Sequence, residues 1–223
     1  MKKILLILFL FCSALLADDS SQKFLDFNLH RFAYIGDLAK VQKALNMGAK
    51  IDSLDDEGMS ALQWAAYKDR ADVVKYLIKN GANKGFKSQS GKNILTYAVQ
   101  NKDTALVKYM LENGVPLEEF STNTNALCVA VEQGDEATVG VLLPYFKNIN
   151  SYYTNNAGDM SWETNTTLLL SAINAKSQNL AKLFISKGAD INKPNSRGET
   201  PLLCAMRNRM YELAILLIDK GAA

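Results

Sequence analysis

The sequence predicts an all-α fold, a solenoid of about six helix-turn-helix units with short hairpin links and one insertion. Glycines that close an apolar run recur with gaps of 33, 33, 74 and 33 residues, at Gly48, Gly81, Gly114, Gly188 and Gly221. Apolar residues at i, i+3 and i+4 precede these glycines and mark one face of a helix. A leucine recurs in an earlier apolar segment of every unit, so each unit is expected to be a helix, a turn and a second helix.

Residues 1–17 precede the repeats and have the pattern of a secretory signal peptide. Lys2 and Lys3 form a short basic region, residues 4–11 are all apolar, and a short stretch then leads to Ala17. The apolar run is shorter than the ~20 residues that a membrane-spanning helix needs. We expect cleavage after Ala17, which would place residues 18–223 in the periplasm or outside the cell. A lipoprotein modified at Cys12 and a retained signal anchor are the alternatives.

Composition and charge narrow the classes of partner. With 48% apolar and 22% charged residues, the chain can bury a core and is not of the disordered class. Loss of residues 1–17 removes Lys2 and Lys3, so that 25 basic side chains become 23 against 23 acidic ones. A neutral mature chain lacks the basic face that nucleic acid requires. We therefore expect no nucleic-acid partner, and no membrane insertion once the signal is cleaved.

The first helix of each unit is expected to begin just after a capping residue. The six positions for this residue are Phe27, Ser60, Asn93, Asn125, Thr167 and Thr200. All except Phe27 are types whose side chains accept a hydrogen bond from the first helical turn. The repeat spacing divides the domain into units of about 22–52, 53–85, 86–117, 118–147, 166–192 and 193–223.

The second helix of each unit is expected to end at a glycine, which adopts the left-handed cap conformation without strain. The fourth unit departs from this pattern, because Pro144 falls where its second helix should continue. Proline removes a backbone donor and clashes with the preceding turn, so this helix is expected to end early. Residues of about 148–165 have no place in the repeat spacing and are expected to loop out.

The repeated segments carry a recognisable consensus. Residues 55–83 read DDEGMSALQWAAYKDRADVVKYLIKNGAN, residues 195–222 read NSRGETPLLCAMRNRMYELAILLIDKGA, and GADIN at 188–192 links two units. These motifs resemble those of ankyrin-repeat proteins over about residues 22–223, and the signal peptide suggests an exported bacterial member. In that family the motif histidine hydrogen-bonds neighbouring backbone, which implies a structural role for His30. The other units lack this histidine, and only Thr200-Pro201 keeps the family's threonine-proline pair.

The resemblance also implies where a partner would bind, namely at the hairpin tips and on the exposed side of the first helices. On the tips these positions are Asp56, Glu57, Met59, Gln89, Lys92, Arg197 and Glu199. On the first helices they are Tyr67, Lys68, Gln100, Asn101, Glu132, Gln133, Arg207 and Asn208. The insertion adds three aromatics, Tyr152, Tyr153 and Trp162, which suit an interface. We expect Tyr152 and Tyr153 to be exposed, whereas Trp162 has two open readings, exposed or folded back into the stack.

No pattern in the sequence indicates an enzyme. The single histidine is placed structurally, and neither a metal-ligand cluster, a glycine-rich phosphate loop nor a nucleophile elbow is present. We expect no catalytic residues, no metal and no cofactor. Cys128 and Cys204 lie two units apart, so we expect unpaired and mostly buried thiols.

Two functions remain open. The first is a protein-binding module of the bacterial envelope that binds or protects a secreted or periplasmic partner, with toxin immunity as a special case. The alternative is a structural or assembly protein that self-associates through its C-terminal repeat. There Ile215 replaces Lys75, Lys108 and Lys182 of other units, and no polar capping unit follows it in the sequence.

Overall fold

The structure is a computed structural model that describes residues 2–89, 91–117, 125–155 and 164–223, with side chains from residue 19 onward except at 154, 155 and 164. It divides into two compact units, Met1–Ile94 and Leu95–Ala223, called unit 1 and unit 2 below. Each unit consists of helix pairs stacked side by side, so the predicted all-α repeat fold is confirmed. Each unit is described by itself.

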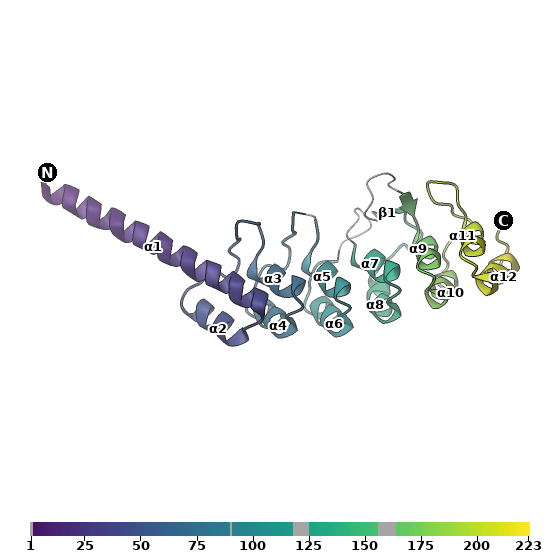
Figure 1. Cartoon of the computed structure of the whole chain (residues 1–223), viewed down its shortest axis with the longest axis horizontal. Helices are drawn as coiled ribbons and strands as arrows, with labels where there is room; N and C mark the ends of the chain where they lie inside the picture. Colours follow the sequence, from purple (N-terminus) through teal and green to yellow (C-terminus); the bar gives the residue numbers. More distant parts are fainter. Residues whose placement is uncertain (1, 90, 118–124, 156–163) are drawn as a thin grey trace. The chain divides into compact units, whose positions relative to one another are not determined.

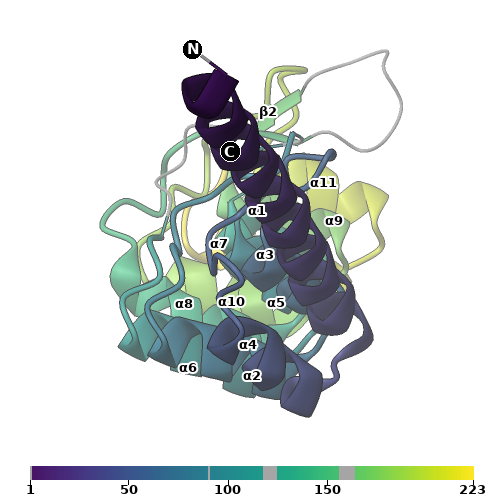
Figure 2. The same cartoon turned by 90° about the vertical axis from the view of Figure 1, so that its left-hand side faces the viewer.

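Unit 1 contains two helix pairs. Their bounds are Lys2–Ile35 for α1, Leu38–Asn46 for α2, Ala61–Tyr67 for α3 and Ala71–Lys79 for α4. Helix α1 packs against α3 in one layer and α2 packs against α4 in the other (Figures 1 and 2). Helix α1 does not begin at Phe27, because it runs on from the N-terminal segment without a break. Phe27 therefore lies within this helix, where no cap is needed.

Unit 2 continues the same arrangement. Its helices are α5 (Ile94–Gln100, which begins at the last residue of unit 1), α6 (Thr104–Glu112), α7 (Ala126–Glu132), α8 (Glu136–Leu142), α9 (Leu168–Asn174), α10 (Gln178–Ser186), α11 (Pro201–Arg207) and α12 (Tyr211–Asp219). Helices α7, α9 and α11 pack in succession in one layer, and in the other layer α6 packs against α8 and α10 against α12. Figure 1 shows the pairs α9–α10 and α11–α12 next to each other.

Capping side chains fix where the helices begin. Ser60 forms a capping box with Gln63, because its hydroxyl accepts from Gln63 N and the Gln63 side chain accepts from Ser60 N. Thr167 caps α9 by accepting from Leu170 N, and Thr200 caps α11 by accepting from Leu203 N. Each bond satisfies a backbone donor that has no partner inside the helix. The expected capping function is thus confirmed at these three residues and also at Asn125, whose side chain accepts from Leu127 N at the start of α7.

Residues with a left-handed backbone conformation follow the helices at equivalent positions of the repeats. The five glycines that close the second helices all have positive φ, between 71° at Gly114 and 99° at Gly48. The turn between the two helices of a pair also needs this conformation, and there it occurs at non-glycine residues as well, with φ of 55–59° at Asp69, Lys102, Lys176 and Arg209. Such conformations are uncommon outside glycine, so the tight turn between paired helices constrains the backbone strongly.

Pro144 shortens its helix as expected. Helix α8 ends at Leu142 after seven residues, whereas α4, α6, α10 and α12 each have nine. The chain continues as a single 3-10 turn, Leu143–Tyr145, with proline in its first residues, where a missing N–H does no harm.

The insertion that follows is more ordered at its ends than a simple loop. Residues Tyr153–Asn155 form β1 and pair antiparallel with Thr164–Thr166, β2, with Tyr153 opposite Thr166. Residues 156–163, which include Trp162, lie outside the described part of the chain, so the two readings for Trp162 stay open.

The link between α10 and α11 holds both described ends of the insertion. The Tyr152 hydroxyl donates to Pro194 O at 2.9 Å, and Ser196 N donates to Asn165 O at 3.0 Å. Lys193 Nζ donates to Asn150 O at 2.5 Å and lies 4.0 Å from the centroid of the Tyr152 ring. These contacts attach the insertion to the repeat that follows it.

A repeated side-chain contact also joins successive links. Asp52, Asn150 and Asn192 lie in the links and accept a backbone N–H from Asn83, Asp190 and Ala223, and Asp26 in α1 accepts one from Lys50 in the same way, all at 2.7–3.0 Å. Asn150 shows that the insertion begins with a residue that still serves the repeat. The stack therefore continues past the shortened helix.

The core lies between the two helical layers of each unit. Its largest fully buried side chains are aliphatic or aromatic and include Leu29, Leu62 and Leu77 in unit 1 and Leu127, Leu169 and Phe184 in unit 2. Alanines at equivalent positions, such as Ala98, Ala130 and Ala172, are also fully buried and let neighbouring helices approach closely. Within the described part of the chain, none of the helices combines the length and apolarity that a membrane crossing requires.

Candidate functional site

Three aromatic rings and a lysine gather on the surface of unit 1. Trp64 lies between Tyr34 and Tyr67, with ring centroids 5.4 Å and 5.9 Å away, and both pairs are edge-to-face. Lys68 Nζ lies 4.6 Å from the Tyr34 ring centroid and 4.7 Å from that of Tyr67. Both tyrosines are exposed, whereas Trp64 and Lys68 are partly covered. We call these four residues the aromatic cluster.

The hairpin before α3 fixes the orientation of Trp64. Asp55 Oδ2 accepts a hydrogen bond of 2.5 Å from the indole Nε1 of Trp64. The other oxygen of Asp55 accepts from Glu57 N and Met59 N, and Gly58 takes a left-handed φ of 71° to close the turn. One carboxylate thus holds both the hairpin tip and the indole ring. The central ring of the cluster is therefore ordered before any partner arrives.

The end of α1 supplies the third ring. Arg70, which precedes α4, donates from Nε to Tyr34 O at 3.3 Å, and its side chain covers Gly36. A Cβ added at Gly36 would lie 2.6 Å from Arg70 Cδ, so the glycine permits this close contact. Tyr34 and Arg70 are in this way tied together at the turn between α1 and α2.

The chemistry of this surface suits protein recognition. Edge-to-face aromatic pairs and cation–π contacts each contribute about 0.5–1.5 kcal/mol, and here they hold exposed rings in one arrangement. No carboxylate among the described residues forms an ion pair with Lys68, so its charge stays available. Asp56 and Glu57 stand exposed at the adjacent hairpin tip. The surface therefore offers rigid aromatic area beside charges of both signs.

The structure leaves most of the positions for which the sequence predicts partner contacts at least partly exposed. The exposed residues are Asp56, Glu57, Tyr67, Gln89, Asn101, Glu132, Tyr152, Arg197 and Arg207. Partly covered are Lys68, Lys92, Gln100, Gln133, Glu199 and Asn208. Of all these residues, the aromatic cluster includes only Tyr67 and Lys68.

The prediction for Met59 is wrong, because its side chain is buried. Met59 directly precedes the capping residue Ser60, and the backbone groups of Met59 and Asp55 bond to each other across the hairpin. An apolar residue in that position normally packs against the first turn of the helix. Met59 therefore helps anchor the hairpin and does not form part of its exposed tip.

The prediction for Tyr153 is also wrong, because only 4% of its surface is exposed. Its side chain enters the core of unit 2, where the hydroxyl makes a short hydrogen bond to Ser171 Oγ on α9. Burial raises the pKa of the Tyr153 phenol well above its ordinary value, so the group stays neutral. Its neighbour Tyr152, which precedes β1, is exposed as expected.

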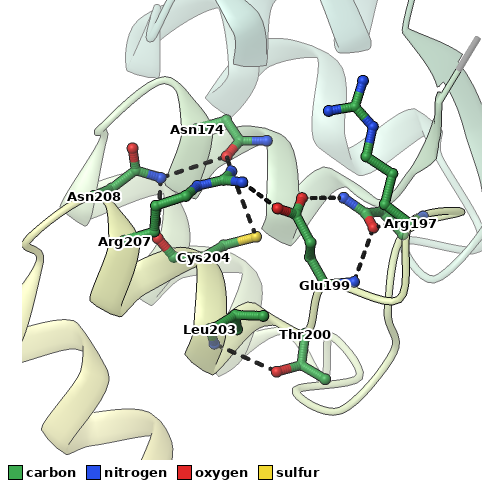
Figure 3. A network of polar contacts seen from close by, with 9 residues as sticks. Asn174, Arg197, Glu199, Thr200, Leu203, Cys204, Arg207 and Asn208 are labelled. Carbon is green, nitrogen blue, oxygen red and sulfur yellow. Dashed lines mark hydrogen bonds and ion pairs between the residues drawn. The ribbon is translucent and has the colours of Figure 1, made fainter. Parts of the chain in front are cut away.

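Several polar residues that the sequence predicts as partner contacts lie on α11 and on the hairpin before it, in unit 2 (Figure 3). Glu199 forms a short ion pair with Arg207 and accepts from Asn195 Nδ2 at 2.8 Å. Arg207 and Asn208 both reach Asn174 on α9. These side chains bond mainly to one another, whereas the guanidinium of Arg197 points away from the network in Figure 3. Within this group, Arg197 offers the freest charge to a partner.

Sequence reasoning missed Tyr34 and Trp64. Tyr34 stands 33 residues before Tyr67, so it occupies the same position in the preceding repeat. This spacing could have identified it. Trp64 lies between them only because α1 and α3 pack side by side, which the repeat alone indicates less directly.

The remaining expectations concern the histidine, the two cysteines and possible metal ligands. His30 is buried and its Nε2 lies 2.8 Å from Ser53 O, which confirms the contact with backbone that the resemblance implied. Cys128 and Cys204 are free and buried, as expected, and burial raises the pKa of both thiols. Among the residues whose side chains are described, no three histidine, cysteine or carboxylate groups gather closely enough to hold a metal.

Comparison with protein families identifies the repeats. The model of ankyrin repeats in three copies matches residues 11–88, 29–122, 80–153 and 127–223. The ankyrin repeat protein YahD of Escherichia coli K12 is 30% identical over 193 residues, which cover 84% of this chain and 92% of that protein. Palmitoyltransferase AKR1 of Saccharomyces cerevisiae is 41% identical over 61 residues, 27% of this chain. That match spans only 8% of AKR1, so it concerns the repeats alone.

Solved structures show the same fold. An ankyrin repeat domain from Acinetobacter baumannii is 28% identical, with a TM-score of 0.73 over 87% of this chain and 98% of that one. A chain in the complex of the Bd0816 predatory endopeptidase from Bdellovibrio bacteriovorus with immunity protein Bd3460 is 24% identical, with a TM-score of 0.71 over 87% and 98%. Ankyrin repeats mediate protein–protein interaction. On the family match and the full-length similarity to YahD, the chain belongs to the ankyrin repeat family.

Proposed function

We propose that the chain is a protein-binding module of the bacterial envelope, which binds or protects a secreted or periplasmic partner protein. The observation that carries this proposal is the aromatic cluster, in which exposed Tyr34 and Tyr67 are held in place by Trp64 and Lys68. Ordered aromatic side chains lose little conformational entropy on binding and dominate interface hot spots. The proposal assigns no catalytic role to the chain.

The mixed charges around the cluster support a protein partner. Lys68 and Arg70 lie on one side, and the hairpin tip carries Asp56 and Glu57. A polyanion such as nucleic acid would be repelled by the acidic tip, and 23 basic against 23 acidic residues after loss of residues 1–17 give no basic field to attract it. A protein surface with both charges and an apolar patch fits this arrangement better.

The envelope location rests on the N-terminal sequence. Residues 1–17 have the basic, apolar and terminal regions of a signal peptide. Toxin immunity is a special case of the same function, in which the partner is a secreted enzyme that the chain holds inactive. A chain of the complex between a predatory endopeptidase and its immunity protein has the same fold, and this likeness motivates the special case.

Export predicts a particular mass. Protein purified from its native cells is expected to begin at Asp18, since a signal peptidase would cut after Ala17. Intact-mass spectrometry of the envelope fraction measures this directly, with the cytoplasmic fraction as control. An intact Met1 in the cytoplasmic fraction alone would contradict the envelope location.

Site-specific crosslinking tests the function itself. A photoreactive phenylalanine analogue at position 67 is expected to form an adduct with an envelope protein in living cells, because Tyr67 is exposed within the cluster. The same analogue at position 47 is the control, since Met47 is exposed at the end of α2 in the other layer of unit 1. Equal adducts at both positions, or none at position 67, would show that the cluster is not the contact surface.

A further inference from the structure

The last helix pair presents an apolar outer surface. Large exposed apolar side chains lie on α11 and α12, namely Leu203, Met206, Tyr211, Ile215 and Ile218, and we call them the C-terminal face. On α12 they are spaced i, i+4 and i+7, so Tyr211, Ile215 and Ile218 form one continuous stripe of the helix. Five large apolar side chains in one place exceed the scattered single residues normal for a protein surface.

The repeat spacing shows what kind of surface this is. In the preceding pair, the equivalent residues Leu170, Ile173 and Ile185 are 0%, 0% and 8% exposed, because α11 packs against α9 and α12 against α10. Thirty-three residues later, Leu203, Met206 and Ile218 are 55%, 50% and 56% exposed. Leu203, Met206 and Ile218 therefore have the side chains of a contact between helix pairs, and no helix pair among the described residues covers them.

The first helix pair carries a charged residue on its outer side, at a position where later pairs have apolar residues. Lys40 occupies the position that Val73 holds in the next pair and that Leu180 and Leu213 hold in later ones, where these residues are buried. Its ammonium forms an ion pair of 2.7 Å with Asp37 and lies 5.6 Å from the Phe32 ring centroid. Covering this position with an apolar surface would bury an ion pair, which costs desolvation energy. The two ends of the repeat array thus differ in chemistry.

We propose that the C-terminal face binds the C-terminal face of a second copy of this chain, forming a two-fold symmetric dimer. A two-fold contact requires a surface that complements itself, and an apolar stripe meets this requirement when two α12 helices pack antiparallel. The charges beside the stripe, Asp219 and Lys220, are opposite in sign, so two such faces do not repel each other. The first pair is a less suitable occupant despite its exposed Phe24 and Phe27, because covering it would bury the ion pair of Lys40 with Asp37.

Sedimentation velocity or light scattering over a range of protein concentrations tests this directly. The chain covering residues 18–223 is expected to change from monomer to dimer with rising concentration and to stop at two copies. The double variant Leu203→Lys, Ile218→Lys is expected to weaken dimerisation by at least about 100-fold, because each copy would bury two charged side chains in place of apolar ones. Circular dichroism melting checks that the variant remains folded.

Met47→Lys is the matched control, since it places the same charge at an equally exposed apolar residue of unit 1 and should leave the dimer unchanged. A wild-type monomer at all concentrations would overturn the proposal, as would a folded double variant that still dimerises. Open-ended growth with concentration would also overturn it, since it would indicate a head-to-tail contact, for example with Phe24 and Phe27, which are exposed on α1. Because crosslinking at position 67 involves unit 1, its result is independent of this test.

Discussion

Replacing Tyr153 by alanine is expected to lower the free energy of unfolding by about 3–5 kcal/mol, the usual cost of truncating a buried aromatic side chain. Tyr153 enters the core of unit 2 from β1 and is nearly fully buried. Its hydroxyl bonds to Ser171 on α9, which is buried as well. The substitution leaves a cavity, removes a hydrogen-bond partner of Ser171 and detaches one end of the insertion from the stack.

Two further variants separate these contributions. Tyr153→Phe keeps the ring and loses the hydroxyl, so we expect a loss of about 1 kcal/mol. Tyr152→Ala is the matched control, because this neighbour is exposed and holds only a cation–π contact and one hydrogen bond, together about 1 kcal/mol. Urea unfolding with linear extrapolation measures all three. Equal losses for Tyr152→Ala and Tyr153→Ala would contradict the buried position of Tyr153.

These two tyrosines show where sequence reasoning reached its limit. The sequence placed both in an insertion outside the repeat spacing, and nothing there indicated which neighbour they contact. The structure pairs Tyr153 with Thr166 in a two-stranded sheet, whereas Tyr152 precedes the strand and stays exposed. A pairing between segments of an insertion has no internal repeat to reveal it. Its register could therefore not be predicted from one sequence.

The helical part of the fold could be predicted because its signals are local and repeated. Capping by Ser60, Thr167 and Thr200 depends on residues three positions away, and the closing glycines depend on their own backbone. Pro144 ends its helix by the same local logic. Phe27 is the exception, since the N-terminal segment continues into the helix and removes the need for a cap.

The candidate site was predictable only in part. Tyr67 and Lys68 could be predicted because they lie on the exposed side of the first helix of a repeat. Tyr34 could be predicted because it holds the same position one repeat earlier. The edge-to-face contacts and the Asp55–Trp64 hydrogen bond depend on how α1, α3 and the hairpin pack together. In unit 2 the equivalent helix end carries Arg207, which is used in a network with Glu199. The same repeat position therefore carries an exposed ring in unit 1 and a side chain engaged in internal bonding in unit 2.

Replacing Tyr34 and Tyr67 together by alanine is expected to weaken partner binding by more than about 2 kcal/mol, as for hot-spot residues. The substitutions also remove two edge-to-face contacts with Trp64 and two cation–π contacts with Lys68, so we expect folding stability to fall by about 2–5 kcal/mol. Lys68→Gln removes the charge and keeps most of the stem, and should weaken binding less, with the greatest effect at low salt. Thermal unfolding of each variant separates lost binding from lost folding.

The most direct measurement is a calorimetric titration of the chain with the envelope protein that crosslinks at position 67. Tyr145→Ala is the matched control, because Tyr145 is equally exposed but lies in unit 2 on the turn after α8. We predict that Tyr34→Ala, Tyr67→Ala raises the dissociation constant by about 30-fold or more, whereas Tyr145→Ala leaves it unchanged. An unchanged dissociation constant for the folded double variant would contradict the assignment of the aromatic cluster as the binding site.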